Sequence, residues 1–347
     1  MVTRERPSRK PNRTRGDDDL VDPHGELVEQ YADFGRYAAA DSACFGAWAT
    51  AVGQDPEVLA WLATLPGEKA QPNLVFASAR WHGVPAPGPY DGLRAALLGD
   101  DGTIRATILA RRTQTNEAGR LATLVPAFAT LGIDEPVALL EVGPSAGLVL
   151  YPDRWSYRWE TAAGPVTAGT GRELRCRVRG DAPLPAEPPR VAWRGGVDLF
   201  PLDVTDPDAM AWLTTLVWPE QQDRRDQLAH AIEVARADPP DLRAGDLLEE
   251  LPGLVAEASA YGPVVVFHTA VIAYLTEPDR VRFHELMTGL VADGACRWVS
   301  NEGKRVLPRV SATGPPIAEE RATFVLGVDG RAVAWTHGHG RSMTWLA

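Results

Sequence analysis

A buried strand that runs directly into a glycine-containing turn is the feature that most restricts the fold of this chain. Residues 137–142 read Val-Ala-Leu-Leu-Glu-Val, and Gly-Pro-Ser-Ala-Gly follows at 143–147. A continuous apolar run of this length is typical of a strand covered on both faces. Small residues between such a strand and a following helix let a ligand approach the backbone and the helix N-terminus. We therefore predict the first strand of an α/β sheet and a ligand-binding turn, with a ligand-free tight turn as the alternative.

The remainder of the second half alternates strands with helices. Strands are predicted at 242–247, 263–268 and 296–300, with helices at 208–216, 224–237 and 280–292. Asp329-Gly330 separates two apolar runs at 322–328 and 331–337, which is a strong signal for a hairpin. Strands alternating with helices indicate a parallel sheet. We predict an α/β, Rossmann-like, mostly parallel sheet that is closed by an antiparallel C-terminal hairpin.

The first third of the chain has a different pattern. Residues 1–20 are polar and charged, which predicts a disordered tail, and residues 21–125 show helical periodicity. Asp55-Pro56 predicts a helix start, with Asp55 as N-cap. Residues 126–347 form the predicted Rossmann-like domain. Weakly alternating segments at 156–159, 174–178 and 190–193 predict strands of an insertion at about 160–195.

The amino-acid composition of the chain limits the kinds of molecule that it can bind. The chain has 46 acidic and 35 basic residues, a formal charge of −11, which disfavours a nucleic-acid partner. Its three cysteines are far apart and form no CxxC pair, which argues against a disulfide framework or a cysteine zinc site. No apolar run reaches the length of a membrane helix. We expect a cytoplasmic protein that meets a small molecule and no membrane.

Polar residues that could carry chemistry fall at predicted strand ends and in one polar run. Ligands of open α/β sheets bind beyond the carboxyl ends of the strands. Each such residue could equally be a helix cap or a solvated loop residue. The candidates are Asn116 and Glu117 in the run 113–117, Asp198 or Asp203, Asp246, His268, and Asn301 with Glu302.

His337 and His339 form a further candidate pair, because side chains two apart in a strand share a face. Two imidazoles could hold a metal with His268 or Glu302 as further ligands. The alternative is a structural pair at a strand end, with the flanking glycines allowing close packing.

The whole chain resembles an uncharacterised bacterial family, domain of unknown function family 2332. The resemblance spans nearly all of residues 20–347. It is carried by residues 113–117 with Arg120, 140–143 and 145–148, Asp153-Arg154, Gly196, Asp198, Pro201, Asp203, 218–221 and 338–340.

From about residue 135 onward the chain also resembles class I S-adenosylmethionine-dependent methyltransferases. In their first motif, glycines stand at the second, fourth and sixth positions after an acidic residue. Here Glu141 is followed by Gly143, Ser145 and Gly147, so serine replaces the middle glycine. The resemblance implies that these four residues, with Asp246 at the adenine, bind S-adenosylmethionine. Glu160, Asp198 and Asp203 are the candidates for the ribose, and we assign Asp203 to the cofactor site.

Three functions follow as hypotheses. The first is methylation of a small molecule, with Asn116, Glu117, His268 and His339 on the acceptor side. The second is a metal-assisted hydrolase that uses His337 and His339. The third is a non-catalytic binding protein on a methyltransferase-like scaffold.

Overall fold

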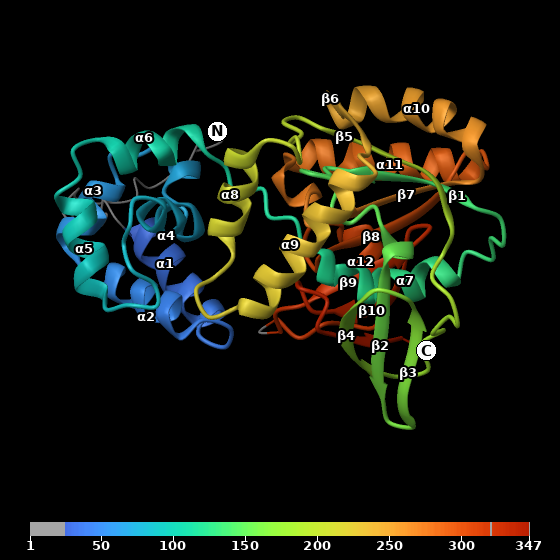
Figure 1. The fold of residues 1–347 in the computed structure, drawn as a ribbon, viewed down its shortest axis with the longest axis horizontal. Coiled ribbons are helices and arrows are strands. Elements are labelled where there is room, and N and C mark those ends of the chain that lie inside the picture. The colour runs from blue at the N-terminus through green and yellow to red at the C-terminus, as the bar shows by residue number, and fades with distance from the viewer. Residues whose placement is uncertain (1–24, 320, 347) are drawn as a thin grey trace, which may run out of the picture.

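The computed structural model describes residues 25–319 and 321–346, so the tail predicted at 1–20 lies outside the described residues. A lobe of helices lies beside a larger part built on one β-sheet (Figure 1). The lobe contains α1 (Gly25–Ala38), α2 (Ala43–Val52), α3 (Pro56–Leu62), α4 (Pro72–Trp81), α5 (Tyr90–Leu98) and α6 (Thr103–Ala110).

The helical lobe is organised around a cluster of buried aromatic rings. Tyr31, Phe45, Trp48 and Phe76 are almost fully buried, and Phe76 makes edge-on ring contacts with each of the other three. Aromatic pairs in this geometry stabilise a core beyond their apolar area. The N-cap predicted at Asp55 is confirmed, because its carboxylate accepts from two amides at the start of α3.

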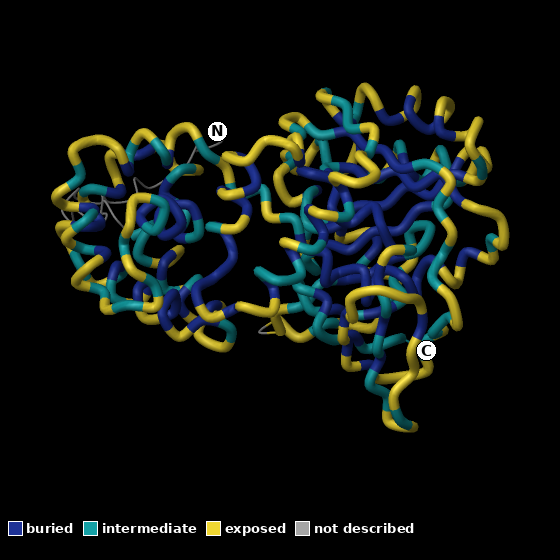
Figure 2. The backbone as a smooth tube through the Cα atoms, viewed as in Figure 1, coloured by how far each residue is buried: buried dark blue, intermediate teal, exposed yellow. Residues whose placement is uncertain are grey.

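One helix from the second half of the chain also packs on the lobe. It is α8 (Pro207–Leu216), which contacts α4, and Trp212 of α8 meets Trp81 of α4 edge-on. The lobe and the sheet therefore share one continuous apolar core, which also contains buried residues of α7 (Leu121–Ala129) and α9 (Gln222–Ala237). Figure 2 shows buried backbone within both parts.

The sheet has eleven strands in the described part of the chain, in the order β3-β2-β4-β11-β10-β9-β8-β7-β1-β5-β6. The strands are β1 (Val137–Val142), β2 (Trp155–Thr161), β3 (Gly164–Gly169), β4 (Arg172–Arg179), β5 (Val191–Asp198), β6 (Asp241–Ala244), β7 (Val264–Thr269), β8 (Arg297–Gly303), β9 (Phe324–Val328), β10 (Arg331–Thr336) and β11 (Ser342–Trp345).

Five neighbouring strands, β6-β5-β1-β7-β8, are parallel. From β1 the chain adds β5 and β6 on one side and β7 and β8 on the other, so the order reverses between β1 and β7. This order is consistent with the Rossmann-like sheet that we predicted, and it puts five carboxyl ends at one edge. A second core lies between this sheet and the helices α10 (Leu247–Ala258) and α11 (Glu277–Ala292).

The C-terminal hairpin is confirmed, but it does not close the sheet. Val328 pairs with Arg331 across Asp329 and Gly330, which have the positive φ values that a tight hairpin turn needs. Beyond β10, β11 pairs with β4, and the sheet continues through β2 and β3. Leu174, Cys176 and Val178 of β4 alternate with exposed arginines, so one face of the added strands is buried in the common core.

The boundaries of the insertion also differ from the prediction. Its strands begin at Trp155, and residues 191–193 belong to β5, the parallel neighbour of β1. Strand propensity alone could not separate these segments, because both kinds of strand have similar local sequences.

The helix expected directly after the glycine turn is absent. Residues 145–149 form turns, and Ala146 and 148–151 are buried in the common core. Gly147 has a φ of +71°, which interrupts a right-handed helix, and Pro152 follows shortly afterwards. The segment is too short for a helix between these two residues. The turn therefore lacks the helix N-terminus that would favour an anionic ligand.

Within the described residues, no helix has the length and apolarity that crossing a bilayer would require.

Asp329 gives a direct test of the hairpin. Its carboxylate accepts from the amide of Trp298 at 2.8 Å and from Nε of Arg297 at 2.7 Å. We predict that Asp329→Ala lowers the free energy of unfolding by about 2 kcal/mol, because these hydrogen bonds are lost. Asp329→Asn tolerates the left-handed backbone and keeps one acceptor, so its loss should be smaller in urea denaturation. Equal losses in both variants would contradict this role.

Candidate functional site

The polar run 113–120 passes from the lobe over the glycine turn, at the carboxyl edge of the parallel strands. Asn116 donates from Nδ2 to the carbonyl of Pro144 at 2.7 Å, and its Oδ1 accepts from the amide of Leu148 at 2.6 Å. Both ends of its amide group are therefore used to hold the turn. We predicted Asn116 on the side of the methyl acceptor. In this structure its side chain holds the glycine turn by two hydrogen bonds.

The glycine turn itself is occupied by protein groups. The amide of Ser145 donates to Oδ2 of Asp198 at 2.8 Å, and the amide of Gly147 donates to the carbonyl of Pro144. A Cβ on Gly143 would lie 2.1 Å from a methyl of Val271, so the Val271 side chain fills the space above this glycine. These amides and this space are what a ligand would otherwise use.

The acidic candidates at the strand ends lie in different settings. Asp198 ends β5 beside β1 and contacts the glycine turn. Asp203 is exposed beyond that strand end, where its carboxylate accepts from the amide and hydroxyl of Thr205. Asp246 caps α10, as the alternative interpretation allowed. Glu160 lies on β2, far along the sheet order from β1. Of the three ribose candidates, Asp198 is the one next to the turn.

Glu141 on β1 is a buried carboxyl group. Its side chain is almost inaccessible, and its Oε2 makes no hydrogen bond to any described residue. Burial raises the pKa of Glu141 well above its usual value; nearby Arg120 opposes this increase, and Asp198 adds to it. Burial therefore favours the protonated, neutral form of Glu141.

His268 and Glu302 lie next to each other, but solvent does not reach them. Nε1 of Trp298 donates to Nε2 of His268 at 3.1 Å, so the ring proton is on Nδ1 and is donated to Oε1 of Glu302 at 2.7 Å. The same oxygen accepts from the amides of Val271 and Ile272. Both ring nitrogens of His268 are used, and the residue is fully buried. The arrangement fits a structural role that holds the segment after β7.

Glu117 is the centre of a buried charged cluster. Its Oε2 lies 2.5 Å from a guanidinium nitrogen of Arg224 on α9 and 3.1 Å from Nδ1 of His339. Arg120 donates from Nε to the carbonyl of Gly338 and from a terminal nitrogen to the carbonyl of Thr269. The cluster therefore joins the polar run, α9, the end of β7 and the loop between β10 and β11.

The charge states in this cluster follow from burial and pairing. Burial opposes the charged form of Glu117, but Arg224 outweighs it, helped by His339 and Arg120, so the pKa of Glu117 lies well below its usual range. Burial lowers the pKa of His339, although Glu117 acts in the other direction. Glu117 is thus a carboxylate and His339 a neutral imidazole at neutral pH.

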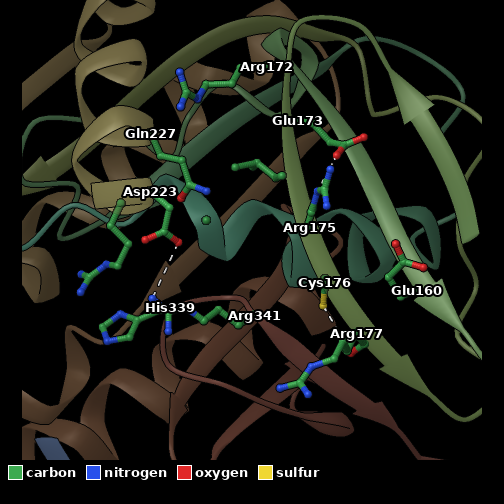
Figure 3. A pocket seen from close by; sticks show the side chains of 13 residues that line it. Glu160, Arg172, Glu173, Arg175, Cys176, Arg177, Asp223, Gln227, His339 and Arg341 are labelled. Carbon is green, nitrogen blue, oxygen red and sulfur yellow. Dashed lines mark hydrogen bonds and ion pairs between the residues drawn. The ribbon is translucent and has the colours of Figure 1, made fainter. Parts of the chain in front are cut away.

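A pocket of about 500 Å³ opens beside this cluster, within the size range of small-molecule sites. Figure 3 shows side chains from β4, α9 and the 337–341 loop around it. Its lining includes five arginines against three carboxylates, a formal excess of two positive charges. These residues are Arg172, Arg175, Arg177, Arg224, Arg341, Glu160, Glu173 and Asp223, with Gly119, Leu174, Cys176, Gln227 and His339 completing the lining.

Two pocket-lining side chains keep unused polar atoms. Nε of Arg224 and both ring nitrogens of His339 are buried without hydrogen bonds to the described part of the chain. The 3.1 Å approach of His339 to Glu117 is close, but its angles do not make a hydrogen bond. Buried polar groups normally have partners, so these atoms indicate a place where another group could bind.

Sequence reasoning identified Glu117 and His339 but missed the arginines of the pocket. The usable signal was the alternation in 172–179, where Arg175, Arg177 and Arg179 share the face opposite the buried residues. Arg224 of α9 and Arg341 of the loop between β10 and β11 gave no such local signal. They lie far from β4 in the sequence and come near it only in the folded chain.

His337 and His339 lie in a turn and not in a strand, because the amide of Gly340 donates to the carbonyl of His337. Their ring centroids are 5.5 Å apart, and Nδ1 of His337 accepts from the amide of His339. No group of three or more His, Cys, Asp or Glu side chains within 25–319 and 321–346 is arranged to hold a metal ion. The pair therefore gives the metal-assisted hydrolase no geometric support.

A model of the family described as "Uncharacterized protein conserved in bacteria (DUF2332)" matches residues 28–345. The chain therefore belongs to this family, as the sequence motifs led us to expect. A search of curated proteins finds no match.

The clamp by Asn116 can be tested by truncation. We predict that Asn116→Ala lowers the free energy of unfolding by about 2 kcal/mol, because the amide of Leu148 loses its acceptor next to a buried segment. Thr115→Ala is the matched control, since Thr115 is the exposed neighbour of Asn116. Urea denaturation of both variants measures the difference. A loss no larger than that of the control would show that the clamp is unimportant.

Glu141 predicts a particular pH dependence of stability. The pKa of a glutamate in an unfolded chain is about 4.3, and burial raises it in the folded protein. Between the two values the folded state binds more protons, so stability falls as pH rises. Glu141→Gln removes this titration, and its stability gain over the parent should grow as the pH rises above about 4.3. Thermal unfolding of this variant and of Glu249→Gln, an exposed control on α10, checks the trend. A gain that stays constant with pH would contradict it.

Proposed function

We propose that this chain is a Rossmann-like protein that binds a small anionic molecule in the arginine-lined pocket. The strand order β6-β5-β1-β7-β8, with its reversal between β1 and β7, supports the Rossmann-like assignment. The pocket lies near the loop that follows β10. Strand β10 runs parallel to β8, because both strands are antiparallel to β9. The site is therefore at the carboxyl edge of the sheet, displaced from the reversal point.

The observation that carries the proposal is the buried Arg224. Its side chain is 8% exposed, it pairs with Glu117, and its Nε faces no acceptor in the described chain. A guanidinium presents its donors as a planar fork that matches carboxylates and phosphates. An anionic ligand would supply the missing acceptor. The lining of the pocket has an excess of positive charge, whereas the whole chain has a formal charge of −11.

His339 adds a second kind of contact. His339 lines the pocket, and its neutral imidazole has two buried ring nitrogens without hydrogen bonds to the described residues, so it could donate one hydrogen bond and accept another. This combination suits a ligand that carries a hydroxyl group near its anionic group.

Calorimetry with simple anions tests the proposal. Inorganic phosphate and glycerol phosphate should bind, and glycerol should not. Arg172→Gln should weaken phosphate binding about tenfold or more, because a charge-assisted hydrogen bond contributes about 1.5–3 kcal/mol. Arg282→Gln is the matched control, since it removes the same charge from an exposed position on α11 that does not line the pocket. Equal affinities of the two variants for phosphate, or no binding of any anion, would contradict the proposal.

S-adenosylmethionine binding remains a second candidate, favoured by Glu141. Its unpartnered oxygen lies on β1 beside the strand-order reversal, and Asp198 and Asp246 follow the next two strands. A ligand here would have to displace the side chain of Val271 and the hydrogen bond from the Ser145 amide to Asp198.

Calorimetry with S-adenosylmethionine and its demethylated product separates the two candidates. Binding that is lost in Glu141→Ala and kept in Arg172→Gln would support the adenosyl site. The absence of any heat with the parent protein would exclude it.

A further inference from the structure

A second, smaller cavity shares a residue with the arginine-lined pocket. It has a volume of about 190 Å³ and is lined by Arg177, Arg179, Arg321, Ser342, Met343 and Thr344. Arg177 lines both cavities. The two cavities therefore meet along the exposed face of β4.

The geometry of β4 determines the spacing of the charges. Arg175, Arg177 and Arg179 alternate with buried residues, so all three project from one face. Successive members are roughly 7 Å apart, from a rise of about 3.3 Å per residue. Ser342 and Thr344 of β11 stand opposite Arg177 and Arg179 and add hydroxyl groups on the same face.

The balance of charge changes along this row. All three carboxylates of the combined lining belong to the larger pocket, where Glu173 pairs with Arg175 and Asp223 approaches Arg341. The smaller cavity has three arginines and no carboxylate in its lining. Arg321 is held over the ring of Trp335, 4.3 Å from its centroid, which orients its guanidinium.

We infer that the two cavities form one site for a small molecule with two separate anionic groups. One group binds at Arg224 in the larger pocket, and the other binds between Arg177, Arg179 and Arg321. The row from Arg175 to Arg179 spans roughly 13 Å at about 3.3 Å per residue, which gives the length scale of the combined site. This inference rests on the proposed function and narrows its ligand to molecules such as bisphosphates and extended dicarboxylates.

A length series of simple probes tests the inference. Calorimetry would compare hexylphosphonate with bisphosphonates whose phosphonate groups are joined by three, six or ten carbons. The parent protein should bind the best bisphosphonate at least tenfold more tightly than hexylphosphonate, with a clear optimum of length. Arg179→Gln should remove this advantage and weaken the binding of hexylphosphonate far less than that of the best bisphosphonate. Arg172→Gln should weaken both kinds of probe, and Arg282→Gln neither.

The outcomes separate the inference from the proposed function. If hexylphosphonate and all bisphosphonates bind equally, and Arg172→Gln weakens them all, the pocket binds one anionic group and the inference is wrong. If no probe binds the parent protein, both are wrong. Tighter binding of a single-stranded oligonucleotide than of any bisphosphonate, with a steep dependence on salt, would overturn the inference in favour of a nucleic-acid surface.

Discussion

The buried pair of Glu117 and Arg224 joins the polar run that leaves the helical lobe to α9, and the charged cluster around it depends on this interaction. Both side chains are less than a tenth exposed, and each compensates the charge of the other. Removing one member of such a pair typically costs about 3–5 kcal/mol, because the remaining charge is left unpaired. The pair holds Arg224 at the wall of the pocket, and Arg120 beside it connects the polar run to the loop between β10 and β11. Structural connection and positive charge therefore come from the same few residues.

The glycine turn shows how a familiar sequence pattern can be used differently. Gly143 and Gly147 do provide close approach, but the groups that approach are Val271 and Pro240. Asn116 and Asp198 take up the polar groups of the turn, and no helix begins behind it. The apolar run with its glycines correctly predicted the strand and the tight turn. Side chains of the protein itself occupy the space that was predicted for a ligand. The charged pocket lies elsewhere along the same edge.

Local patterns predicted much of the architecture. The buried run at β7, the Asp-Gly hairpin and the cap at Asp55 depend on near neighbours, and all three are confirmed. The short strand β11 was missed because its pairing with β4 is decided by residues far away in the chain. His268 and Glu302 were correctly placed at strand ends, but their mutual hydrogen bond and full burial depend on Trp298 and on packing. Periodicity does not contain that information.

The position of β11 has a consequence for the order in which the protein is assembled. Strands β2, β3 and β4 end by residue 179, yet they join the rest of the sheet through residues 342–345. Until residues 342–345 have been synthesised, β4 has an open edge with unpaired backbone groups. The exposed arginines along β4 give that edge a positive charge, which discourages two nascent chains from pairing there. The sheet is thus complete only after residues 342–345 have been synthesised, more than 160 residues after β4.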